Sequence, residues 1–106
     1  MVNHQIDLGA LTGSGKVRNL SGHDKGTAAR QKFELGLLDA SEEPVTITVP
    51  KYVYAVSASF VQGMFAESLQ ALGSADAFFK RYRFEASSSI IRQIERGLAS
   101  RRMAAA

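Results

Sequence analysis

The sequence predicts a small α/β domain with a mixed, mainly parallel sheet and about three helices. Along the chain, predicted strands alternate with predicted helices. The strands are segments in which apolar and polar residues alternate, and the helices are segments whose apolar residues recur at helical spacing. Right-handed crossovers between such strands make the main strands parallel. A length of 106 residues fits a single domain, and we expect residues 1–106 to form it, with a core over about 5–100 and a frayed tail over 101–106.

The first strand is expected over Gln5–Leu8, where the residues alternate up to a glycine. The segment that follows, Gly9–Val17, contains a Gly-Ser-Gly-Lys run and invites comparison with a nucleotide-binding loop. A Walker loop requires Gly where Ala10 stands, and it requires Ser or Thr where Val17 stands. We therefore expect a flexible loop or a two-stranded turn here, rather than a nucleotide-binding enzyme.

The first helix is expected from about Thr27 to Ala40, with Asp24 or Thr27 as its N-cap. Its predicted apolar face consists of Ala29, Phe33, Leu37 and Ala40. His23 and Asp24 precede it, but no nucleophile in the sequence is evidently partnered with them, so a polar loop is the simpler interpretation.

The middle of the chain has the clearest pattern. Ser41–Pro44 is a connector, Val45–Val49 alternates as a strand does, and Lys51–Val56 is again extended. A helix then runs from about Ser57 to Leu72 and stops at Gly73, the left-handed residue that commonly ends helices. Its predicted apolar stripe is Phe60, Val61, Met64, Phe65, Leu69 and Leu72.

Between this strand region and this helix lies the segment Val56–Phe60, which we call the serine turn. Its two hydroxyls, on Ser57 and Ser59, stand at a helix N-terminus, where free backbone N–H groups favour an acceptor oxygen or an anion. Ser59 and Gln62 also have the spacing of a capping box. Helix capping is therefore the simplest role for both serines.

The last third of the chain predicts one more strand and one more helix. Ala75–Lys80 is expected to be a short connection, whose Phe78 and Phe79 are either core aromatics or a surface pair. Tyr82–Phe84 alternates as a strand, with Phe84 inward. The final helix is expected over about Ser89–Arg101, and its apolar stripe is Ile90, Ile91, Ile94 and Leu98.

Composition limits the function classes. The chain has no cysteine, which excludes disulfides and thiolate metal sites, and no apolar run reaches the ~18 residues of a membrane span. Its N-terminus lacks the basic and apolar regions of a signal peptide, so we expect a cytoplasmic bacterial protein. We expect no catalytic residues, no metal and no cofactor.

Charge is unevenly distributed along the chain. The segment from Lys80 to the end has seven basic and two acidic residues, a balance of +5, whereas the first 79 residues have a balance of −2. A basic C-terminal helix keeps open the alternative of a nucleic-acid-associated or phage-related binding protein. Glu95 interrupts the basic face formed by Arg92 and Arg96, and aromatic residues for stacking are missing, so nucleic acid is not the expected partner.

The strand Val45–Val49, the serine turn and the run Phe65–Leu69 together resemble the STAS-like family of unknown function. This family is related to the STAS domains (sulphate transporter and anti-sigma-factor antagonist), and the resemblance spans about residues 5–97. It implies a small STAS-like sandwich and a non-enzymatic, regulatory protein-interaction module. The implied partner is a histidine-kinase-type ATPase or an anti-sigma-like kinase, and homo-oligomerisation is left open.

The resemblance also implies where a partner binds. In anti-sigma-factor antagonists a kinase phosphorylates a serine in an Asp-Ser-Ser/Thr turn; aligned here, the aspartate falls at Ser57 and the phosphoserine at Ala58. Either Ser57 or Ser59 is then the acceptor, or the chain lacks this switch. Family members carry glycine and arginine near the first helix, which Gly26 and Arg30 match. The expected site comprises Gly22, His23, Asp24, Gly26, Arg30, Ser57, Ser59 and Phe60.

Overall fold

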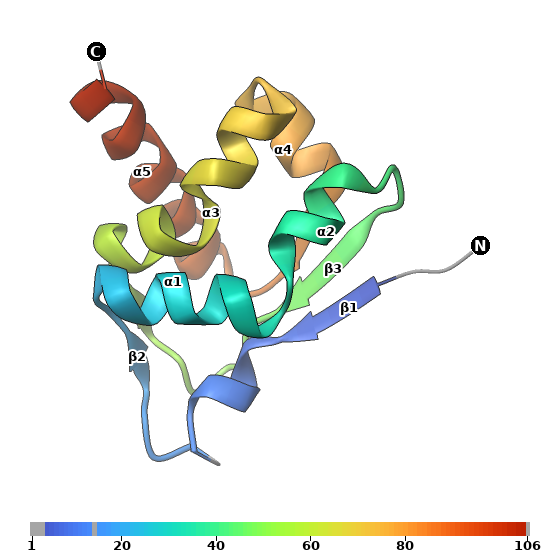
Figure 1. The fold of residues 1–106 in the computed structure, drawn as a ribbon. Coiled ribbons are helices and arrows are strands. Elements are labelled where there is room, and N and C mark those ends of the chain that lie inside the picture. Colours follow the sequence, from blue (N-terminus) through green and yellow to red (C-terminus); the bar gives the residue numbers. More distant parts are fainter. Residues whose placement is uncertain (1–3, 14, 106) are drawn as a thin grey trace.

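The computed structural model describes residues 4–13 and 15–105 of the chain, with side chains as far as residue 99. Three parallel strands form the main sheet, and helices lie between and after them in the sequence (Figure 1). The predicted α/β class with a mainly parallel sheet is confirmed. The described residues form five α-helices, however, rather than about three.

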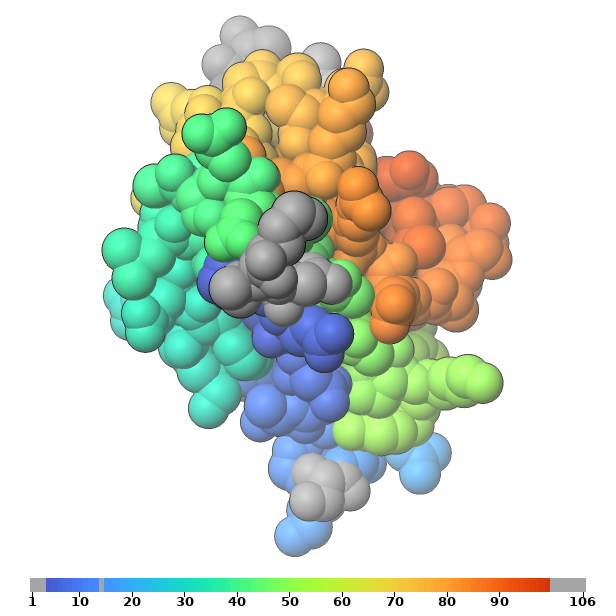
Figure 2. All heavy atoms as spheres, turned by 90° about the vertical axis from the view of Figure 1, so that its right-hand side faces the viewer, coloured from blue at the N-terminus to red at the C-terminus, as the bar shows by residue number. Residues whose placement is uncertain are grey.

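The main sheet consists of β1 (His4–Asp7), β3 (Val45–Thr48) and β5 (Tyr82–Glu85), with β3 in the middle. Its buried face presents Ile6, Val45, Ile47 and Tyr82 to the helices. The residues that alternate with them are polar, and those of β1 and β5 are exposed. β1 is an edge strand that lies at the surface, drawn in blue in Figure 2. Across the described residues, the buried side chains of the sheet therefore lie on the face that packs against the helices.

A second, smaller sheet pairs β2 (Asn19–Leu20) with β4 (Ala55–Val56), also in parallel. Only the last two residues of the extended segment predicted over Lys51–Val56 form a strand, and this strand pairs with β2 instead of extending the main sheet. This small sheet places side by side the two segments that lead into the helices α1 (His23–Lys32) and α3 (Ala58–Leu72).

The single helix expected over 27–40 is wrong in two respects. α1 (His23–Lys32) begins four residues earlier, because Gly22 takes a positive φ of 99° and serves as the N-cap in place of Asp24 or Thr27. Glu34 then adopts a left-handed conformation, with φ of 55°, which ends α1 and starts α2 (Leu35–Ala40) in a new direction.

The break between α1 and α2 also changes which side chains are buried. Leu35 becomes fully buried, whereas Leu37, expected on the apolar face, is 69% exposed. Ala40 is exposed as well. Only Ala29 of the predicted face is fully buried, and Phe33 packs against the core in part.

α3 (Ala58–Leu72) matches its prediction closely and forms the centre of the fold. It ends at Gly73, whose φ of 93° is the expected left-handed one. The predicted apolar stripe is buried from Phe60 to Leu69, and Leu72 is partly buried. α3 lies against both α1 and α5 (Figure 1).

The segment expected as a short connection before β5 is a helix, α4 (Ala75–Arg81), capped by the hydroxyl of Ser74. It buries Phe78 completely, in edge-on contact with Phe65 at a ring-centroid distance of 5.5 Å. Phe84 points inward as expected and is partly buried, but Tyr82 is the fully buried residue of β5. Phe78 is thus a core aromatic residue.

The last helix, α5 (Ser88–Ala105), begins one residue earlier than expected, after an N-cap provided by Ser87. It buries Ile90, Ile94 and Leu98, while Ile91 is only partly buried. The helix continues through most of the segment expected to be frayed, 101–106; residue 106 lies outside the described residues.

Candidate functional site at the serine turn

Ser57 is the N-cap of α3. Its backbone is extended, with φ of −74° and ψ of 156°, and its Oγ accepts a hydrogen bond from the Phe60 N–H at 3.1 Å. The expected capping box starting at Ser59 is wrong by two residues, since Ser59 lies inside the first turn of α3. The Oγ atoms of Ser57 and Ser59 are 3.1 Å apart and hydrogen-bonded, so the two hydroxyls act as one pair.

A second helix starts beside this pair. The Ser57 Oγ also accepts from the Gly22 N–H, at 3.4 Å, and Gly22 is the N-cap of α1. The parallel pairing of β2 with β4 explains this arrangement, because Ser57 donates its own N–H to the Leu20 carbonyl at 2.8 Å. The amino ends of α1 and α3 therefore meet at one hydroxyl, where the partial positive charges of both helices favour acceptor groups.

Gln93 of α5, to which no sequence pattern assigns a role, binds the backbone that leads into the serine turn. Its amide oxygen accepts from the Val56 N–H at 2.8 Å, and its amide nitrogen donates to the Tyr54 carbonyl at 3.2 Å. One side chain of α5 thus satisfies a backbone donor of β4 and the backbone acceptor just before that strand. A glutamine on the partly polar side of a helix carries no sequence signal of such a contact.

Two of the remaining predicted residues are surface residues near the turn. His23 and Asp24 are the first residues of α1, and both are exposed. Asp24 lies in the first helical turn, where a negative side chain is favoured by the helix dipole. Gly22, His23, Asp24 and the serine pair therefore do form one surface region.

Gly26 and Phe60, by contrast, face the interior. Gly26 is buried against Gly63 where α1 and α3 cross, and a Cβ atom there would collide with the Phe60 carbonyl oxygen and the backbone of Met64. The Phe60 ring is 1% exposed. These two residues position the turn but offer no side chain to a partner.

Arg30 lies two turns further along α1 and belongs to a buried polar cluster. Its guanidinium donates to Asp39 Oδ2 at 2.6 Å, to Ser68 Oγ at 2.7 Å and to the Met64 carbonyl at 3.1 Å. Tyr82 completes the cluster by donating to the other oxygen of Asp39 at 2.5 Å. Burial, and then the hydrogen bond and charge of Asp39, raise the pKa of the Tyr82 phenol.

This cluster joins α1, α2, α3 and β5, and the Arg30 side chain is only 12% exposed. A buried ion pair with its remaining hydrogen bonds filled fixes the relative placement of elements more than it adds stability. The arginine that was expected beside the turn is therefore a packing residue, and it is not available to bind a phosphate at Ser57 or Ser59.

The glycine-rich loop that follows β1 closes on itself. The Val17 N–H donates to the Thr12 carbonyl at 2.9 Å, and the Lys16 N–H donates to the Gly13 carbonyl at 3.4 Å. The Thr12 hydroxyl is also 2.6 Å from the Tyr52 hydroxyl. These N–H groups are used within the loop, so they do not form the cradle that a nucleotide phosphate requires. Residue 14 lies outside the described residues.

No known protein family, curated protein or solved structure showed a significant match to this chain. Within residues 4–13 and 15–105, helices that combine the length and the apolar character needed to cross a membrane are absent. Across the same residues, groups of three or more histidine, aspartate or glutamate side chains suited to holding a metal ion are absent too. The geometry of the serine turn is therefore the main evidence for a function.

Proposed function

We propose that this protein is a regulatory protein-interaction module of the bacterial cytoplasm, whose partner binds over the serine turn. The observation that carries this proposal is the hydroxyl pair of Ser57 and Ser59 at the shared amino end of two helices. The STAS-like resemblance of the same residues supports it, because in anti-sigma-factor antagonists a serine in the corresponding turn, at the position of Ala58 here, switches partner binding. The partner class by this resemblance is a histidine-kinase-type ATPase or an anti-sigma-like kinase.

Phosphorylation within the turn would act as the switch. A phosphate adds about −1.5 to −2 charges and three acceptor oxygens. At the amino ends of α1 and α3 this charge is favoured within the protein itself, by the helix dipoles and free N–H groups. The same charge at a partner interface would oppose binding wherever the partner is acidic or apolar.

Ser59 is the better acceptor of the two serines. It is exposed, and its hydroxyl bonds only to Ser57 among the described residues. The Ser57 oxygen, in contrast, is partly buried and accepts from the N–H groups of Gly22 and Phe60, so its modification would disturb both helix ends. Tyr54, which is 64% exposed and precedes the turn, is the aromatic residue most available for a partner contact.

The test is affinity capture from the source cell with matched serine variants. Wild type, Ser59→Ala and Ser59→Asp are immobilised at equal density, and retained proteins are quantified by mass spectrometry. We expect one protein to be retained by wild type and Ser59→Ala, and at least fivefold less by Ser59→Asp, which corresponds to about 1 kcal/mol. Ser74→Asp is the control for added charge at a helix start, because Ser74 is exposed like Ser59 and caps a different helix, α4.

The result of this capture experiment distinguishes a phosphorylation switch from a general effect of charge and from nucleic-acid binding. Equal retention by wild type, Ser57→Asp and Ser59→Asp would mean that the turn is not a switch. Loss of the partner in Ser74→Asp as well would mean that added charge alone weakens capture. Retention that falls steeply with salt, and that depends on Arg92 and Arg96 of α5, would indicate nucleic acid instead.

A further inference from the structure

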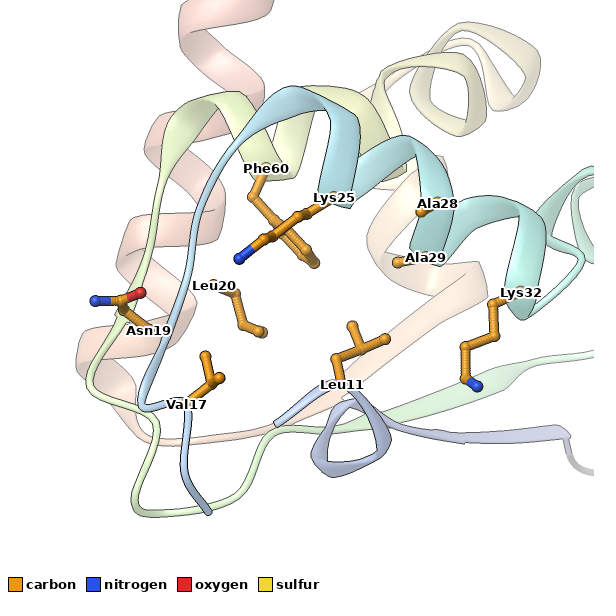
Figure 3. Close-up of a pocket in the computed structure, with 9 residues that line it drawn as sticks. All are labelled: Leu11, Val17, Asn19, Leu20, Lys25, Ala28, Ala29, Lys32 and Phe60. Carbon is orange, nitrogen blue, oxygen red and sulfur yellow. The ribbon is translucent and has the colours of Figure 1, made fainter. Parts of the chain in front are cut away.

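A pocket with an apolar interior lies beneath α1, between that helix, β2 and the short 3₁₀ helix η1 (Leu8–Leu11) (Figure 3). Its volume is about 200 Å³. The residues that line it are Leu11, Val17, Asn19, Leu20, Lys25, Ala28, Ala29, Lys32 and Phe60. Neither the serine turn nor the STAS-like resemblance accounts for this pocket.

The floor of the pocket is made by core residues. Leu20, Ala29 and Phe60 are between 1% and 3% exposed, and their side chains point toward the hollow in Figure 3. Protein interiors are close-packed, with few voids larger than a water molecule. An apolar cavity of about 150 Å³ stays dry and accepts benzene. A pocket of the present size therefore suits an apolar group of at least about six carbon atoms.

The rim of the pocket is positively charged. Lys25 and Lys32 are seven residues apart on α1, so they lie on one face of the helix, separated by two turns or about 10.5 Å. Among the described residues neither lysine forms an ion pair, and the lining contains no aspartate or glutamate. Each lysine has a flexible stem, which allows both ammonium groups to approach one anion at the mouth.

We propose that this pocket binds a small amphiphilic carboxylate, an aliphatic or aryl-substituted acid of about six to eight carbon atoms. The apolar body lies against Leu20, Ala29 and Phe60, and the carboxylate lies at the rim between Lys25 and Lys32. Burial of the apolar body supplies the affinity, and the two ammonium groups select an acid over a neutral compound of the same shape. This proposal is independent of the partner proposed for the serine turn.

The first experiment compares three probes on the full chain by two-dimensional amide NMR: octanoate, 1-octanol and inorganic phosphate. We expect octanoate to cause saturable shifts centred on Leu20, Ala29 and Phe60. Octanol is expected to shift the same amides with at least tenfold weaker affinity, and phosphate alone to leave them unchanged. An absence of saturable shifts with octanoate up to several millimolar would overturn the proposal, and equal affinities for octanoate and octanol would overturn the role of the lysines.

Variants then test the two parts of the site separately. Lys25→Met with Lys32→Met keeps an unbranched side chain one atom shorter at both positions and removes the charge, so octanoate affinity should fall at least tenfold, to that of octanol. Lys51→Met with Lys80→Met is the matched control, because both lysines are exposed and neither lines this pocket. If the control pair weakens octanoate binding as much as the pocket pair, net charge rather than the pocket is responsible.

Ala28→Phe tests the pocket itself. Ala28 lines the pocket but is exposed on α1, so a larger side chain fills the mouth without entering the core. We expect this variant to keep the wild-type amide spectrum outside the pocket and to lose binding of octanoate and octanol alike. Unchanged binding in Ala28→Phe would place the ligand elsewhere on the protein and overturn the assignment.

Discussion

Two strand–helix units lie side by side in this protein: β2 leads into α1, and β4 leads into α3. The two strands pair in parallel, and the two helices cross where Gly26 meets Gly63. Despite this common plan, the helices are held in different ways. α3 buries large apolar side chains, whereas the face of α1 toward α3 and the core is built from Gly26 and Ala29.

The β2–α1 unit compensates with polar contacts. The Arg30 side chain of α1 donates hydrogen bonds to Asp39 of α2 and to Ser68 of α3. At the amino end of α1, the Gly22 N–H donates to the Ser57 hydroxyl. α3 depends less on such contacts, because the burial of its large apolar side chains stabilises it directly. The comparison teaches that α3 contributes more hydrophobic burial than α1, while α1 depends on its contacts with α3 for its position.

Removal of a large core side chain of α3 should lower the stability most. Phe65 is 1% exposed and contacts Phe78 and Phe84 edge-on. Phe65→Ala should lower the free energy of unfolding by about 3–5 kcal/mol, measured by urea denaturation. Phe33→Ala, which follows α1 and removes a ring that is only partly buried, should cost clearly less. Equal losses would mean that the two units share the core evenly.

The second largest loss of stability should come from a substitution at the crossing of α1 and α3. A Cβ atom at Gly63 would collide with the His23 carbonyl oxygen and would lie 2.9 Å from the Thr27 nitrogen, both of them rigid backbone atoms. Gly63→Ala should therefore destabilise the protein by about 1–3 kcal/mol in urea denaturation.

Gly36→Ala is the matched control for the crossing. Gly36 lies in α2, and a Cβ atom there would meet no other atom within 4 Å. The same substitution should then stabilise the protein slightly, by about 0.4–1 kcal/mol, because alanine restricts the unfolded chain. If both variants are destabilised alike, the close approach of α1 and α3 is not the cause.

The polar ties of α1 predict a pH dependence. The pKa of Tyr82 is raised above its ordinary value of 10.0, so the folded protein keeps the phenol protonated where the unfolded chain ionises. This contribution to stability is fully present below pH 10 and is lost as the pH rises toward the folded-state pKa. Tyr82→Phe should cost about 1–2 kcal/mol at pH 7 through the lost bond to Asp39.

By pH 11 the gap in unfolding free energy between wild type and Tyr82→Phe should shrink by about 1.4 kcal/mol, since one pH unit corresponds to that amount. Urea denaturation at both pH values measures this change. Tyr54→Phe is the control for the loss of a tyrosine hydroxyl, because its ring is 64% exposed and it takes no part in the buried cluster. A gap for Tyr82→Phe that stays constant from pH 7 to 11 would contradict the buried cluster.

The smallest predicted effect is a difference in stability between the alanine variants of Ser57 and Ser59. Ser57→Ala removes an acceptor from the N–H groups of both Phe60 and Gly22, and it should cost about 1 kcal/mol of stability. Ser59→Ala removes only a bond between two hydroxyls at the surface, and it should cost less than about 0.5 kcal/mol. Thermal unfolding of the two variants measures this difference. A larger loss of stability for Ser59→Ala than for Ser57→Ala would mean that Ser59, not Ser57, is the main cap of α3.

The location of the candidate site was predictable, but its composition was only partly so. Ser57 and Ser59 stand at the start of α3 as expected, because a strand followed by a hydroxyl residue and an apolar stripe is a local pattern. Gly22 lies beside them because β2 pairs with β4, which no local pattern shows. Arg30 was assigned to the wrong place: its sequence neighbours do not show that Asp39 and Ser68 lie within reach of its guanidinium. Gln93 was missed for the same reason, since its partners are 37 and 39 residues away in the chain.

The sequence by itself determined the elements whose signals are local: the strand Val45–Thr48, the helix that runs to Gly73, and the parallel α/β class. Alternation, apolar periodicity and a left-handed glycine act over a few residues, so they can be read directly. The tertiary structure alone decided the break at Glu34, the helical form of Ala75–Arg81 and the pairing of β2 with β4. Each of these depends on burying a particular side chain, such as Leu35 or Phe78, against residues that are distant in the chain.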